Sequence, residues 1–274
     1  SFRLYFPELF IIKTQVAFLA LGLIALGLML VRLYQRGPLQ EIGPTIREHL
    51  ALCALGFFAV CYFVISVAGN LNLGIRHILP IFVPLFILVA VATVSLARRL
   101  AGTRWRTVSA ATLATLLAWY TVATFWIYPS FTAYFNELIG GPANAYKYVS
   151  DSGVDWGQDL VRLKQYVDSH PEINHLALDY FGGGDARYYF CERAYDSHGR
   201  LIATAEGYDC TDSIYEPWHP ENGPYTGQYI AVSETFLEND IWYSAQRGDK
   251  GYEHLRNTNP IAKIGYSIYL FKLY

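Results

Sequence analysis

The sequence predicts an α-helical multispanning membrane region of about four transmembrane helices, followed by a small extracytoplasmic α/β domain. The chain of 274 residues is 53% hydrophobic and only 16% charged, which is more apolar than an ordinary soluble domain. Its charge also changes sign along the chain. Residues 1–128 contain 10 Lys and Arg against 3 Asp and Glu, whereas residues 129–274 contain 11 against 20. We therefore assign residues 1–128 to the membrane region and residues 129–274 to the soluble domain.

Four uncharged runs approach or exceed the length that a helix needs to cross the hydrocarbon core, about 20 apolar residues. They predict spans at about 15–34, 50–68, 78–97 and 108–128. The first run is short, and it is extended by Gln15 and by Arg32, which can reach the interface with its long side chain. Buried helices of a soluble protein are the alternative. Four such runs in succession, separated by arginine-rich links, favour the membrane.

The arginines also predict the orientation of the spans. Arg32, Arg36 and Arg47 follow the first run, and four arginines follow the third, whereas the link at 69–77 has only Arg76 and His77. Positively charged links stay in the cytoplasm. The N-terminal segment, the 69–77 link and everything after 128 are therefore expected on the outer side.

The domain after residue 128 alternates helical and strand patterns. A capping box formed by Asp155 and Gln158 predicts a helix from there to about residue 168. Residues 175–181 and 228–233 read as strands, 237–246 and 252–256 as short helices, and 262–273 as a strand or hairpin. The glycines at 182–184 are interpreted as a turn, since no phosphate-loop spacing surrounds them.

Two cysteines, Cys191 and Cys210, are the only pair in the soluble domain. In an oxidising compartment we expect them to form a disulfide. Free or metal-binding thiols are the alternative, but no CxxC or Cys/His spacing favours a metal. We expect neither a metal nor a cofactor.

Three basic residues are candidates for binding a lipid phosphate. Arg76 and His77 lie at the outer end of the third span, and Lys13 lies at the outer end of the first. A cation at this depth can pair with a phosphate, although it can also serve only to anchor a helix at the headgroup layer.

A second group of candidates lies in the segment DSGVDWGQD, in which Asp151, Asp155 and Asp159 recur every four residues. Asp155, Trp156, Gln158 and Asp159 are candidates for contact with a sugar or an acceptor. Helix capping and packing are the alternative, and the spacing does not match a calcium loop. The acidic, tyrosine-rich domain also argues against a nucleic-acid partner, because phosphate backbones require a basic face.

The segment YFNELIGGPANAYKYVSDSGVDWGQDLVRL resembles the C-terminal part of bacterial membrane glycosyltransferases related to the dolichyl-phosphate-mannose protein mannosyltransferases and the aminoarabinose transferase of lipid A. Further similar stretches are YFPELFIIKT, NLNLGIRHILP, LALDYFGGGDARYY, YIAVSETFL and PIAKIGYSIYLFKLY. The resemblance implies a C-type fold in the bacterial inner membrane, a polyprenyl-phosphate-linked sugar as donor, and inverting transfer at the outer face. It also makes Arg76 a better candidate for the phosphate of the donor.

The essential acidic residue of those enzymes lies in a large external loop near their N-terminus, and no such loop occurs here, so no catalytic residue is named. We therefore expect the chain to be the C-terminal portion of a longer enzyme. A noncatalytic membrane scaffold, bound to other membrane subunits, is the second hypothesis. The absence of acidic residues from the spans disfavours a proton-coupled transporter.

Overall fold

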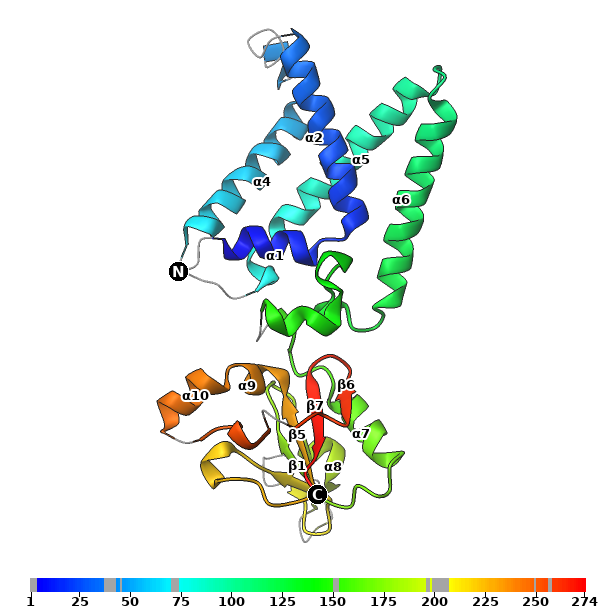
Figure 1. The fold of residues 1–274 in the computed structure, drawn as a ribbon. Coiled ribbons are helices and arrows are strands. Elements are labelled where there is room, and N and C mark those ends of the chain that lie inside the picture. Colours follow the sequence, from blue (N-terminus) through cyan, green and yellow to red (C-terminus); the bar gives the residue numbers. More distant parts are fainter. Residues whose placement is uncertain are drawn as a thin grey trace. The chain divides into compact units, whose positions relative to one another are not determined.

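The computed structural model describes residues 4–36, 43–44, 46–69, 74–149, 153–195, 198, 207–248, 250–255 and 258–274. The chain forms two compact units, Ser1–Gly141 and Pro142–Tyr274 (Figure 1). Each unit has its own core and is described by itself.

The first unit is helical. Its long helices are α2 (Val16–Arg36), α4 (Leu50–Ala68), α5 (Leu79–Leu100) and α6 (Arg106–Trp126), preceded by the shorter α1 (Tyr5–Lys13). One-turn 3₁₀ helices lie at η1 (Ile75–His77), η2 (Phe131–Ala133) and η3 (Glu137–Ile139). Helix α5 packs along α4, and α2 contacts both α5 and α6. These bounds agree with the four predicted spans to within a few residues.

Three of these helices, α4, α5 and α6, are long and apolar enough to cross a membrane, and a fourth span results if α1 and α2 count as one bent element. Their apolar side chains are largely exposed: Phe57 is 73% and Ile65 is 71% accessible on α4. Large apolar surfaces of this kind are not stable in water. Helix α6 is also flanked by Trp105 and Trp126, as is typical of spans with aromatic residues at both interfaces. The helices therefore indicate a membrane protein.

The helical unit continues to Gly141, thirteen residues beyond the end at 128 that the composition suggests. The reason is a set of contacts between this segment and the first helix. The buried side chain of Asn136 donates hydrogen bonds to the carbonyls of Ile11 and Thr14, at 2.6 and 2.7 Å. Its backbone N–H donates to the carbonyl of Ile12 at 2.8 Å. Hydropathy cannot reveal such contacts, because they join residues more than 120 positions apart.

The second unit contains a five-stranded mixed sheet in the order β4-β1-β5-β7-β6. Its strands are β1 (Leu176–Asp179), β4 (Tyr215–Pro217), β5 (Tyr229–Ser233), β6 (Ala262–Ile264) and β7 (Ile268–Lys272). Strands β4 and β5 pair in parallel with β1, and β7 pairs antiparallel with both β5 and β6. Two short strands, β2 (Glu192–Arg193) and β3 (Tyr208–Asp209), form a separate ladder.

Both faces of the five-stranded sheet are covered. Helices α7 (Leu160–Asp168) and α8 (Arg187–Phe190) pack on the face that contains Leu176, Leu178 and Ala231. The other face contains Ala177, Ile230 and Val232 and packs against aromatic residues, with Trp218 and Tyr252 among them. The remaining elements are η4 (Pro142–Lys147), η6 (Pro220–Asn222), α9 (Glu234–Glu238), α10 (Asp240–Arg247) and η7 (Glu253–Leu255). This confirms an α/β unit after the helical unit.

The predicted start of the helix at Asp155 is wrong. Helix α7 begins at Leu160, and Asp159 precedes it without a side-chain cap. Asp155 Oδ1 instead accepts a hydrogen bond from the N–H of Gly157, whose φ of 71° lies in the left-handed region. Gln158 folds back onto the N–H of Trp156 at 2.7 Å. The segment is therefore a tight turn, since a helix cannot continue through a residue with that φ.

Candidate functional site

The first helix is broken directly after Lys13. Helix α1 and helix α2 are joined by Thr14 and Gln15 and meet at an angle of 111°. A helix end leaves carbonyl groups without intrahelical partners, which is costly away from water. Asn136 provides partners here, since its side-chain amide binds the carbonyls of Ile11 and Thr14. The break is therefore a fixed feature of the fold, held by a residue that lies far along the chain.

A cavity of about 210 Å³ lies beside this break. Residues from α1, α2, α5, α6 and the segment after α6 contribute to its wall. They are Lys13, Thr14, Gln15, Phe18, Phe82, Phe86, Tyr120, Thr124, Ile127, Phe131 and Tyr134. We call it the helix-break cavity. Its wall combines aromatic rings with hydroxyl and amide groups, and Lys13 is the one charged side chain among the described residues that line it.

Two hydrogen bonds orient the polar side chains at the helix-break cavity. Lys13 Nζ donates to the carbonyl of Thr132 at 2.7 Å and lies 4.4 Å from the ring centre of Phe135. Gln15 Nε2 donates to Thr124 Oγ1 at 2.8 Å. An ammonium group has three protons, so Lys13 can bind an anion without losing its contact with the backbone.

Three buried polar atoms of the cavity wall lack hydrogen-bond partners among the described residues: Thr14 Oγ1, Gln15 Oε1 and Tyr134 Oη. Buried polar groups in proteins are almost always paired, with protein, water or a ligand. Three residues of the cavity wall therefore each carry a buried polar atom that no described residue satisfies.

Arg76 and His77 lie elsewhere in the helical unit. They form η1 at the start of α5, where Ile75 and Ile78 pack against the first turns of α1. Tyr5 at that end of α1 accepts a hydrogen bond from the N–H of Gly74. Arg76 is exposed, and His77 Nε2 is buried without a partner among the described residues. Neither residue lines the helix-break cavity. The three basic candidates therefore do not share one cavity.

The acidic candidates of the second unit gather at the edge of the sheet where β1 and β5 end. Asp159 is buried and accepts hydrogen bonds from Arg162, from the N–H of Tyr266 and from Ser267 Oγ, at 2.7 to 3.1 Å. Ser233, the last residue of β5, accepts from the N–H of Phe181. Ligands of open α/β sheets bind at this kind of edge. Asp151 lies outside the described residues.

Asp155 is 1% exposed, and its Oδ2 has no hydrogen-bond partner among the described residues. Burial raises the pKa of Asp155 to about 7, and the neighbouring Asp159 carboxylate adds to the shift. Trp156, in contrast, is 48% exposed. The structure therefore places these candidates on one turn, in which two carboxyl groups are buried and the tryptophan side chain is exposed.

A further polar cluster is absent from the sequence-based candidates. Asp179, at the end of β1, is buried and accepts hydrogen bonds from the hydroxyl of Tyr252 and from His219 Nδ1, the latter at 2.9 Å. Burial raises the pKa of Asp179, although both partners favour its charged form. Only the fold brings these three residues together, because they lie 40 and 73 positions apart.

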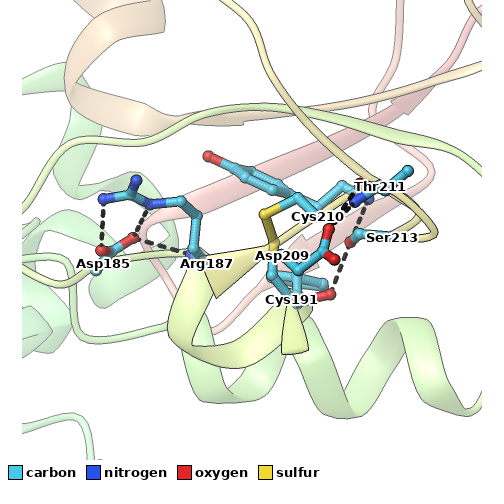
Figure 2. The surroundings of a disulfide bond; sticks show 9 residues. Asp185, Arg187, Cys191, Asp209, Cys210, Thr211 and Ser213 are labelled. Carbon is cyan, nitrogen blue, oxygen red and sulfur yellow. Dashed lines mark hydrogen bonds and ion pairs between the residues drawn. A yellow bond between two sulfur atoms is a disulfide. The ribbon is translucent and has the colours of Figure 1, made fainter. Parts of the chain in front are cut away.

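The predicted disulfide between Cys191 and Cys210 is confirmed. It joins the ends of the β2–β3 ladder. Figure 2 shows Ser213 beside it, whose hydroxyl donates to the carbonyl of Phe190 at 2.7 Å. In the same view Asp185 holds Arg187 through a bidentate pair. Cys53 and Cys61, on α4, form no disulfide. A disulfide agrees with an oxidising compartment.

Among the residues that the structure describes, no group of three or more His, Cys, Asp or Glu side chains is placed to hold a metal ion. Comparison of the chain with protein-family models, with curated proteins and with solved structures found no match in any of the three searches.

Proposed function

We propose that the chain is the C-terminal part of a membrane glycosyltransferase that transfers a sugar from a polyprenyl-phosphate donor at the outer face of the bacterial inner membrane. The helix-break cavity carries this proposal. Its wall residues provide one lysine, several hydroxyl and amide side chains and several aromatic rings, at ends of the helices that the arginine pattern assigns to the outer side. Such a wall suits the head group of an anionic lipid.

The proposed reaction class comes from the resemblance of the motifs to membrane glycosyltransferases. In this proposal the donor binds in the helix-break cavity. Discontinuous helices provide polar groups at membrane depth for bound ions and substrates in other membrane proteins. Lys13 is the cationic contact for the donor phosphate in this proposal, and Arg76 and His77, in η1 at the start of α5, are a second basic position. The chain offers no assigned catalytic residue.

The test is lipid binding by the purified protein in detergent, with polyprenyl phosphate as the probe and polyprenol as its uncharged counterpart. We expect the protein to prefer the phosphate. Lys13→Gln should weaken phosphate binding by roughly tenfold or more, because a hydrogen bond to a charged group contributes about 1.5–3 kcal/mol. Lys164→Gln, on the exposed pair with Asp168 in α7, is the matched control.

Equal binding of the two lipids, or an unchanged affinity in Lys13→Gln, would contradict this role for the cavity. Arg76→Gln tests the second basic position in the same assay, and an unchanged affinity there would remove Arg76 from the proposal.

A noncatalytic scaffold in a larger membrane complex is the second candidate. It is favoured by the absence of an assigned catalytic acid from the chain. Affinity purification from native membranes distinguishes the two: fixed stoichiometry with other membrane subunits, without sugar transfer from polyprenyl-phosphate sugars by the complex, supports the scaffold. Sugar transfer by the purified native protein supports the glycosyltransferase proposal.

A further inference from the structure

A second cavity of the helical unit lies between α2, α5 and α6, three helices that contact one another pairwise (Figure 1). Its volume is about 280 Å³, and its wall is formed by residues from 21–28 of α2, 92–100 of α5 and 108–116 of α6, together with Trp105. Eight residues of helix extend about 12 Å, so the cavity is a groove of roughly that length along the helices. We call it the inter-helix groove.

The wall of the inter-helix groove is apolar and accessible. All the described residues that form it are uncharged, and all except two threonines and one serine are aliphatic or aromatic. Ile24, Leu28, Trp105 and Val108 keep between 40% and 56% of their surface exposed. A ligand can therefore reach these side chains, and a wall of this kind favours a hydrocarbon chain over a polar group. For helices that cross a membrane, the surrounding hydrocarbon is lipid.

One end of the inter-helix groove is positively charged. Arg98 and Arg99 end α5, Arg104 lies in the link to α6, and Arg106 begins α6; all four arginines are exposed. The guanidinium group of Arg104 lies 5.3 Å from the ring centre of Trp105, which is itself part of the groove wall. The positive charge and the apolar wall are therefore directly adjacent.

No acidic residue of the surrounding helices compensates this charge. The sequence has no Asp or Glu in 16–36, which covers α2, or in 79–126, which covers α5, α6 and their link. A guanidinium group can form two parallel hydrogen bonds with a phosphate. Basic pockets between transmembrane helices on the cytoplasmic side bind the head groups of anionic lipids in other membrane proteins. An apolar groove that ends at four arginines therefore complements both parts of such a lipid.

We propose that the inter-helix groove binds one anionic phospholipid of the cytoplasmic leaflet, with an acyl chain between α2, α5 and α6 and the phosphate at the arginines of the α5–α6 link. This site is separate from the helix-break cavity, since the two have no wall residue in common. The arginine pattern assigns this end of the helices to the cytoplasm, whereas sugar transfer is proposed at the outer face. The inference therefore does not depend on the proposed function.

The experiment measures the binding of phosphatidylglycerol, and of phosphatidylethanolamine with the same acyl chains, to the delipidated full chain in detergent by native mass spectrometry. We expect one phosphatidylglycerol per chain, bound about tenfold or more tightly than phosphatidylethanolamine. The double substitution Arg104→Gln and Arg106→Gln should lower the affinity for phosphatidylglycerol by about tenfold. Ala97→Phe, which fills part of the groove, should lower that affinity without changing the charge.

Each variant has a matched control. Arg47→Gln removes an exposed arginine from the other arginine-containing link, between α2 and α4, and Ala54→Phe enlarges an exposed alanine on α4. Both should bind phosphatidylglycerol as the wild-type protein does, because neither residue lines the inter-helix groove.

Equal affinity for the two phospholipids would overturn the inference. An unchanged affinity in Ala97→Phe would also overturn it, because the head group would then bind at the surface with no acyl chain in the groove. So would a loss in Arg47→Gln equal to that in the double variant, which would indicate general attraction between charges. Polyprenyl phosphate that binds more tightly than phosphatidylglycerol, and that loses affinity in Ala97→Phe, would assign the groove to the donor lipid instead. The proposed function is tested separately, by Lys13→Gln.

Discussion

Asp155 combines near-complete burial with a titratable side chain. As the presumed first residue of a helix it would be an exposed cap, whereas in the structure it is a buried carboxyl group with a pKa of about 7. The difference arises from Gly157, whose left-handed backbone converts the expected helical turn into a loop.

The raised pKa of Asp155 predicts how stability depends on pH. The unfolded group titrates near 3.8, whereas the folded group holds its proton up to about pH 7. The folded state therefore binds more protons between these values, and its stability falls as pH rises through this window and levels off above it. Asp155→Asn, which imitates the protonated carboxyl group, should remove much of this dependence and raise stability near pH 8.

Urea unfolding of the full chain in detergent, followed at several pH values, measures this effect. Asp168→Asn is the control, because Asp168 is exposed and paired with Lys164 on the surface of α7. An identical pH dependence in wild type and Asp155→Asn would show that Asp155 is ionised in the folded protein.

Some residues could be predicted because their roles depend on local pattern. The pairing of Cys191 with Cys210 followed from their being the only cysteines of the soluble domain. Thr14, Gln15 and Tyr134 were not assigned to a site, since what marks them is one buried polar atom each without a hydrogen-bond partner among the described residues. The polar triplet Lys13-Thr14-Gln15, directly before an apolar run, was the available signal.

At the scale of elements, the long helices were predictable and the break between α1 and α2 was not. Helix α4 matches its predicted span because its 19 residues are uncharged, almost all apolar, and about as many as a span needs. The break depends instead on Asn136, which satisfies two carbonyls at the end of α1. Hydropathy contains no information on a contact between residues so distant in the chain.

Asn136→Ala should loosen this break. The side chain of Asn136 is fully buried, so its removal leaves the carbonyls of Ile11 and Thr14 unpaired, at a cost of about 1–3 kcal/mol in the free energy of unfolding. Cys53 and Cys61 on α4, which form no disulfide, report on the helical unit through their thiols. Their labelling by a maleimide during heating should begin at a lower temperature in the variant.

Asn222→Ala, an exposed substitution in η6 of the other unit, is the control and should label like wild type. Labelling of Asn136→Ala at the wild-type temperature would mean that the break is held by other contacts.

For the whole molecule, the arginine pattern makes a prediction about sidedness. The link between α5 and α6 should face the cytoplasm, because Arg98 and Arg99 end α5, Arg104 lies in the link and Arg106 begins α6. Gly102→Cys, in a background in which Cys53 and Cys61 are replaced by Ala, should react with an impermeant maleimide only in opened cells or inverted vesicles. Glu221→Cys, in the α/β unit, should react in intact spheroplasts.

The reverse labelling pattern would invert the assigned topology and place the disulfide in a reducing compartment. Labelling of both positions from the same side would mean that the chain crosses the membrane an even number of times between them. Helix α6 would then not be a span.

The disulfide also makes the α/β unit tolerant of cleavage. Strand β4 lies beside β1 in the sheet but follows it only after the β2–β3 ladder, and Cys191–Cys210 provides a second covalent path across 19 positions of that connection. A protease that cuts between Glu192 and Asp209 would therefore leave a single molecule, with β4 still attached next to its neighbour. The two fragments would separate on a gel only after reduction.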